Sequence, residues 1–186
     1  HHIANLYLEN GATWYHASTN GEAGVVSKVN NFSARTGGAI VKIEQAADSG
    51  DIFINNYSGN AKVHYTYDES PVMLQGGSVV IEDASGGSKL TLYTDFSDKI
   101  TKDNLQNVMN ALANKVYYLG YQYKTDETTG NIVDANFGDN GKYADGDGNV
   151  YRDVDGEQVY LGNIHAKEGE EGYLVEGFNP IRKDAD

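Results

Sequence analysis

Hydrophobic and polar residues alternate over short stretches through roughly the first hundred residues of the chain. The clearest of these stretches cover residues 3–8, 40–43, 52–54, 62–67, 78–81 and 90–93. Gly, Asn, Asp or Ser follows each of them within a few residues, and these residue types favour turns. Short alternating stretches bounded by turn residues predict a succession of short β-strands.

Two of the segments resemble one another. Residues 37–49 (GGAIVKIEQAADS) and residues 76–88 (GGSVVIEDASGGS) align with a one-residue gap, 39 positions apart (37 to 76). A repeat of about 20 to 50 residues indicates a solenoid or an array, in which stacked copies bury a face that one copy cannot bury alone. Stacking would place eight apolar residues on one interior column: Ile40, Ile43, Ile52, Ile54, Val79, Ile81, Leu90 and Leu92. The pattern therefore predicts an all-β solenoid over residues 3–100, with a β-sandwich of the same short strands as the alternative.

Residues 101–116 break the strand pattern. Their apolar side chains recur at helical spacing, at Leu105, Val108, Met109, Leu112 and Val116. This spacing predicts an amphipathic helix over 101–116 that lays its apolar stripe against the solenoid wall or across an open coil. Thr101 is expected to cap its start and Lys115 to suit its end.

Residues 117–186 are expected to continue the same solenoid. Strand-like segments cover 116–123, 158–164 and 173–175. An acidic, turn-rich insert at 134–156 separates them.

Four motifs carry a resemblance to a known family. They are residues 6–14 (LYLENGATW), 56–65 (NYSGNAKVHY), 75–84 (QGGSVVIEDA) running into 88–95 (SKLTLYTD), and 108–118 (VMNALANKVYY). In this order the chain resembles the passenger regions of type V secreted autotransporters from Veillonella- and Selenomonas-like anaerobic bacteria. Residues 161–169 (LGNIHAKEG) look similar to such passengers as well, whereas the acidic insert departs from their pattern.

The resemblance implies a right-handed parallel β-helix, secreted and displayed on the bacterial outer membrane. It further implies an adhesin or a display scaffold, seldom with catalytic residues. The partner would be a protein or glycan of a host or bacterial surface.

Charge and composition exclude several classes of function. The chain carries 27 Asp and Glu against 14 Lys and Arg, for a net charge of −13, and no Lys/Arg cluster is present to follow a phosphate backbone. Nucleic-acid binding is therefore not expected. No apolar run approaches the ~20 residues of a membrane span and no signal peptide is present, so we expect a soluble, trimmed segment that does not insert into membranes. The absence of cysteine excludes disulfides and thiol chemistry.

The acidic insert holds the one candidate metal site. Oxygen-bearing side chains alternate there at Asp145, Asp147, Asn149, Asp153 and Asp155, as hard-cation loops require. An EF-hand is improbable on this spacing, because Val150 stands where the loop needs Gly and Gly156 where it needs a bidentate Glu. The alternatives are a looser calcium loop and a solvated acidic hairpin, and no other cofactor is expected.

No catalytic motif appears, since Gly-x-Ser-x-Gly, P-loop and His-Glu-x-x-His patterns are all absent. The 14 tyrosines could stack on sugar rings, although Tyr is also a common strand residue. The sequence thus predicts a non-enzymatic cell-surface segment, an adhesin or display scaffold. The alternative is a carbohydrate-binding or carbohydrate-active solenoid, for which Arg152 beside Asp153 and Asp155 would be the candidate chemistry.

Overall fold

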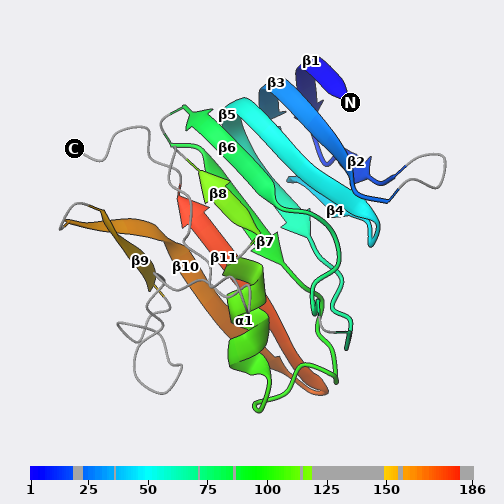
Figure 1. The fold of residues 1–186 in the computed structure, drawn as a ribbon, viewed down its shortest axis with the longest axis vertical. Helices are drawn as coiled ribbons and strands as arrows, with labels where there is room; N and C mark the ends of the chain where they lie inside the picture. The colour runs from blue at the N-terminus through cyan, green and yellow to red at the C-terminus, as the bar shows by residue number, and fades with distance from the viewer. Residues whose placement is uncertain are drawn as a thin grey trace.

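The short alternating segments form strands that stack in parallel, coil upon coil, in the computed structural model (Figure 1). The structure describes residues 1–18, 23–35, 37–70, 72–85, 87–113, 115–118, 149–154 and 157–180. These residues form a β-solenoid of about three turns with one helix. The predicted solenoid is thereby confirmed against the β-sandwich alternative.

Two sheets form the walls of the solenoid. Sheet A is entirely parallel and contains β1 (His2–Glu9), β3 (Val25–Arg35), the first part of β5 (Ser49–His64), β6 (Val79–Ala84) and β8 (Val116–Tyr118). Sheet B begins with the parallel strands β2 (Thr13–His16), β4 (Val41–Gln45), the last part of β5 and β7 (Lys89–Tyr93). The strand β5 is long enough to pass from sheet A into sheet B without a break.

The structural repeat is one coil, which is shorter than the repeat expected from the sequence. In sheet A, Ile3 pairs with Val29, Val29 with Ile54 and Ile54 with Ile81, so successive coils add 26, 25 and 27 residues (29 − 3, 54 − 29, 81 − 54). The expected spacing of 39 residues is wrong as a structural repeat, because it relates β4 of sheet B to β6 of sheet A. Strands of opposite walls resemble one another since both bury a β-branched face in the same interior.

The interior holds two facing columns instead of one. Ile52, Ile54, Val79 and Ile81 come from sheet A and Ile43, Leu90 and Leu92 from sheet B, all at most 1% exposed, whereas Ile40 is half-buried. At the turn between the sheets, Phe32 and Tyr57 stack with ring centroids 5.7 Å apart. The Tyr57 hydroxyl donates to the carbonyl of Lys89 at 2.6 Å and accepts from the amide of Ala61 at 3.0 Å. These bonds satisfy backbone groups where the chain turns.

The helix α1 (Leu105–Ala113) is shorter than the expected 101–116. Val108, Met109 and Leu112 are buried on the expected face. α1 packs on two antiparallel strands, β10 (Glu157–Gly169) and β11 (Gly172–Pro180) (Figure 1). The expected Thr101 cap is wrong: the side chain of Asn104 accepts from the Thr101 amide at 2.8 Å and donates to the Lys99 carbonyl at 2.8 Å.

The last two residues of the predicted helix, Lys115 and Val116, lie beyond the end of α1. Val116 belongs to β8, so the chain has already returned to sheet A at that position. The Lys115 ammonium group donates to the carbonyl of Gly76 at 2.6 Å and lies 5.5 Å from the centre of the Tyr65 ring.

Strands follow the helix as expected: β8 extends sheet A, whereas the three later strands do not add a coil. β9 (Asn149–Val154), β10 (Glu157–Gly169) and β11 (Gly172–Pro180) are antiparallel, and β11 pairs with β7 at the edge of sheet B. Together with α1 they cover the end of the stack. Among the described residues, no helix is long and apolar enough to cross a membrane.

Candidate functional site

Each coil of sheet A interrupts its in-and-out alternation at the same place. In β3, Asn30 and Asn31 both point outward between the buried Val29 and Phe32, and in β5, Asn55 and Asn56 do the same. Strict alternation would drive one of two consecutive side chains into the core. The break therefore bends the wall and brings a polar row to the outer surface.

This row is an asparagine ladder. Asn31 donates to the Oδ1 of Asn5 at 2.9 Å, and Asn56 donates to the Oδ1 of Asn31 at 3.0 Å. Asp83 occupies the next position, as the register partner of Asn56. The ladder stabilises the stack and fixes the orientation of the amides.

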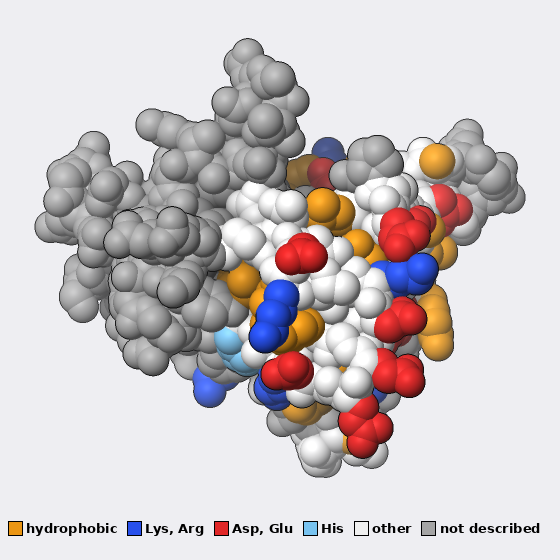
Figure 2. Space-filling view, turned by 90° about the horizontal axis from the view of Figure 1, so that it is seen from below, with side chains coloured by type: hydrophobic (Ala, Val, Ile, Leu, Met, Phe, Trp, Pro, Cys, Tyr) orange, Lys and Arg blue, Asp and Glu red, His pale blue; other side chains and the backbone are white. Residues whose placement is uncertain are grey.

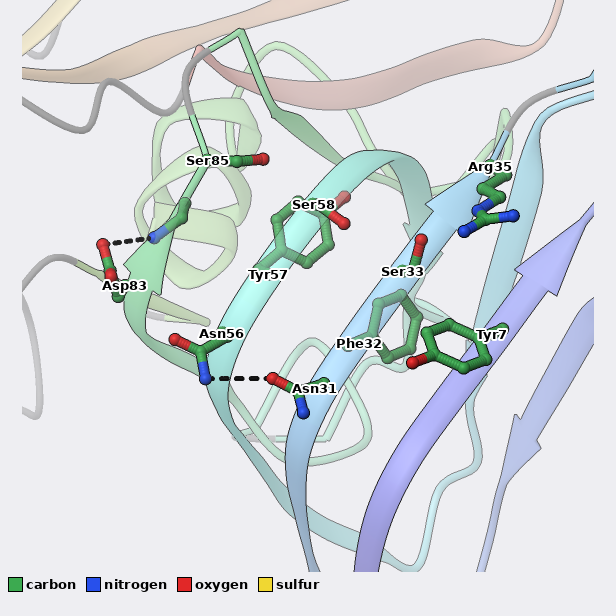
Figure 3. Close-up of a pocket in the computed structure, with 11 residues that line it drawn as sticks. Tyr7, Asn31, Phe32, Ser33, Arg35, Asn56, Tyr57, Ser58, Asp83 and Ser85 are labelled. Atoms are coloured by element: carbon green, nitrogen blue, oxygen red, sulfur yellow. Dashed lines mark hydrogen bonds between the residues drawn. The ribbon is translucent and has the colours of Figure 1, made fainter.

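A row of small hydroxyl side chains lies beside the ladder. Ser33 and Ser58 are register partners on β3 and β5, and Ser85 follows where β6 ends. At the β1 end of the same row stands Tyr7, the register partner of Ser33, whose ring is 62% exposed. Because the serine side chains are short and that of Tyr7 is long, a hollow of about 370 Å³ lies on the outer face of sheet A (Figure 3).

The rim of the hollow is basic on one side. Arg35 and Tyr7 stand together in Figure 3, with the guanidinium carbon 5.8 Å from the ring centre. The hollow continues past Ser58 towards Asn60 and Lys89, over a floor that includes Gly59 and Gly87. We call this continuous surface, from Tyr7 and Asp83 to Lys89, the sheet A groove.

The groove offers hydroxyls, amides, an aromatic face and cations, which are the groups that hold sugars. Of the residues that line it, only Asp83 carries a carboxyl group. A glycoside hydrolase of the common type needs two carboxyl groups on opposite sides of the bond. The described lining thus presents groups that bind sugars, together with one carboxyl group.

A second polar cluster is buried inside the solenoid. The Nε2 of His16 lies 2.8 Å from the Ser27 hydroxyl, and its Nδ1 lies 2.7 Å from the Oε1 of Gln45, which also accepts from Ser49. The order of hydroxyl, imidazole and amide resembles a hydrolase triad. However, Ser27 is 2% exposed and His16 is 4% exposed, so no substrate reaches them. The cluster satisfies buried polar groups.

A third cluster lies on the outer face of sheet B. His64 places Nδ1 2.7 Å from Glu44 and Nε2 2.8 Å from Asp95. Both nitrogens carry a hydrogen only in the imidazolium form, so the two bonds together require the charged ring. Burial lowers the pKa of His64, but the hydrogen bonds of Glu44 and then Asp95 outweigh that effect, and the pKa lies above 6.5.

Stability is expected to fall as the pH rises through the folded-state pKa of His64. Because this pKa is raised, the contribution of the cluster is complete below pH 6.5 and is lost above the folded value. We expect a loss of about 1 kcal/mol, or about 2–4 °C in Tm, because the two carboxylates are partly solvated. Thermal unfolding between pH 6 and 9 measures it, and the variant His64→Gln should show no such loss.

His16 makes the stability of the protein depend on pH in the opposite direction. Burial lowers the pKa of His16 below 6.5, against the opposing effect of the hydrogen bond that its ring donates to Gln45, so its contribution to stability is lost as the pH falls. A His64→Gln variant that kept the loss of stability above neutral pH would contradict the assignment to His64.

The candidate calcium residues are only partly within the described structure. Asn149 and Asp153 lie in β9, paired with Asn163 and Gln158 of β10. Asp145, Asp147 and Asp155 lie outside the described residues. The calcium site therefore stays a prediction. In the described part of the chain, no group of three or more potential ligands is close enough to hold a metal ion.

The sheet A groove was not predicted from the sequence, although the sequence holds a signal for it. The triplets Asn31-Phe32-Ser33 and Asn56-Tyr57-Ser58 repeat 25 residues apart (56 − 31), and each places an amide and a hydroxyl outside with an aromatic ring inside. Asp83-Ala84-Ser85 is a third, weaker copy. Comparison of such triplets would have found both the coil length and the groove.

Comparisons with known proteins leave the assignment to the geometry. No family model, curated protein or solved structure matches the chain.

Proposed function

We propose that this chain is a non-enzymatic segment of a bacterial cell-surface protein, an adhesin whose sheet A groove binds a component of another surface. The observation that carries the proposal is the groove itself, with hydroxyls, oriented amides, an exposed tyrosine and cations in register on successive coils. Because the strands behind it are rigidly paired, these groups are preorganised and lose little entropy on binding.

The fold suits such a role. A solenoid presents the same outer row on every coil, so an extended ligand meets a regular series of contacts. The proposal includes a secreted, outer-membrane-displayed location because the sequence motifs resemble those of autotransporter passengers.

The groove can be blocked without disturbing the core. Ser58 points outward at the centre of the groove, and a Ser58→Tyr substitution would fill the hollow. We expect the native chain to bind members of a panel of glycans and extracellular matrix proteins, and Ser58→Tyr to reduce this binding at least about ten-fold.

The matched control is Thr13→Tyr, which adds the same ring at an exposed position of β2 on sheet B. This variant should bind as the native chain does, and both variants should retain the native Tm. Equal binding by Ser58→Tyr and the native chain would show that the groove is not the site.

A display scaffold is the second candidate. It is favoured by the covered end of the stack, where α1 and the β10–β11 hairpin close the interior and make the coils a self-contained support. A native chain that binds no member of the panel would favour this role over adhesion.

The carbohydrate-active alternative depends on Arg152, Asp153 and Asp155, of which Arg152 and Asp153 lie on β9.

A further inference from the structure

The cations of the sheet A groove lie along one rim. Arg35 ends β3, Asn60 follows Gly59, the register partner of Ala34, and Lys89 is the register partner of Asn60. Neighbouring strands are about 4.8 Å apart, so the backbones of Arg35 and Lys89 are about 10 Å apart along the solenoid axis. The rim therefore runs across the strands, with an amide between two positive charges.

Arg35 is placed for an external anion. Its guanidinium lies over the ring of Tyr7, and no carboxylate of the described residues lies within 4.0 Å of it. Two carboxylates flank the region: Glu9 is the register partner of Arg35 on β1, and Asp83 lies at the opposite end of the hollow (Figure 3). A guanidinium in this position has donors directed to solvent.

The basic rim contrasts with the rest of the molecule. The net charge is −13, and on the face seen in Figure 2 Asp and Glu side chains are scattered, with Lys and Arg side chains between them. Two basic side chains that line one groove thus mark the place where a negatively charged ligand is tolerated.

We propose that the groove binds an acidic saccharide chain, lying across the strands along the solenoid axis, with a carboxylate group held by Arg35. This proposal rests on the proposed function and names its ligand class. Tyr7 provides a flat face for a sugar ring, Ser33 and Ser58 exchange hydrogen bonds with ring hydroxyls, and Lys89 lines the far end of the groove. The planar guanidinium pairs with a carboxylate through two parallel hydrogen bonds, which a neutral or esterified sugar cannot replace.

The test compares one saccharide with and without its carboxylate charges. Tetragalacturonate and its methyl ester share the sugar skeleton, and their affinities for the native protein can be measured by calorimetry or by chemical-shift titration. We expect the acid to bind at least about ten-fold more tightly than the ester at low salt, and this difference to shrink as salt rises.

The matched variants are Arg35→Gln and Lys28→Gln, which remove one positive charge each from the exposed face of β3. Lys28 does not line the groove. Arg35→Gln should lose about ten-fold in affinity for the acid and little for the ester, while Lys28→Gln should change neither. Equal losses of affinity in both variants would show that net charge alone explains the effect, and would overturn the proposal.

The outcomes also separate this inference from the proposed function. A native chain that binds neutral glycans, is blocked by Ser58→Tyr and gives equal affinities for acid and ester would keep the adhesin and overturn the acidic ligand. A native chain that binds no glycan or matrix protein at all would overturn both.

Discussion

Gly59→Ala is expected to destabilise the solenoid by at least about 4 kcal/mol and to lower Tm by about 10 °C or more. Gly59 lies where β5 leaves sheet A for sheet B, with φ of +100°, a conformation that residues with a Cβ rarely adopt. A Cβ at this position would lie well inside 3.0 Å of the carbonyl of Ala34 in the neighbouring coil. Since the obstacle is backbone, the coils themselves would have to move apart.

Gly87→Ala is the matched control for that prediction. Gly87 also has a positive φ, of +78°, but a Cβ there meets nothing within 4 Å. Only the backbone strain remains, at about 1 kcal/mol or about 2–4 °C in Tm. Thermal and urea unfolding of both variants measure the difference. Equal losses would show that the close approach of the coils at Gly59 does not govern stability.

Ile54→Ala is expected to destabilise the protein by about 3 kcal/mol. Ile54 is 0% exposed in the middle coil, and its register partners are Val29 on one side and Ile81 on the other. Removing its outer carbons leaves a cavity that paired strands on both sides cannot close. Urea titration should show a lower midpoint with an unchanged slope.

The same truncation at Ile3 provides the comparison. Ile3 lies in the same interior column, on β1, where it is only partly buried. Ile3→Ala should cost about 1 kcal/mol, because less apolar surface is lost from the core. Similar costs at both positions would contradict the view that each coil is stabilised chiefly by its two neighbours.

The fold could be predicted because apolar residues that point inward alternate along the sequence with residues that point outward. Val79 and Ile81 alternate with exposed or half-buried neighbours, and residues of this kind indicated several of the strands and their inward faces, whereas β2 and β3 were not singled out. The length of a coil was not recoverable from the best-matching segments, because Ile43 and Ile81 both fill the core from opposite walls. The helix face was predicted for the same reason as the strands.

Details that depend on side-chain hydrogen bonds were not predictable from residue type. Thr101 and Asn104 are both ordinary caps, and only the position of Lys99 and Thr101 in space shows that Asn104 fixes the turn before α1. The sheet A groove escaped prediction because serine and asparagine are common on any solvated strand. Their significance arises from stacking, when Ser33 and Ser58 become neighbours.

The return of β11 to β7 has a kinetic consequence. Strand pairs between neighbouring coils join residues 20 to 37 positions apart (61 − 41, 116 − 79), whereas Val175 bonds to Thr94 across 81 positions. The entropic cost of closing a loop rises with the length of the loop. The β10–β11 hairpin, by contrast, closes through a short local turn between Gly169 and Gly172. Coils and hairpin can thus form separately, and we expect the docking of the hairpin on β7 to be a late event in folding.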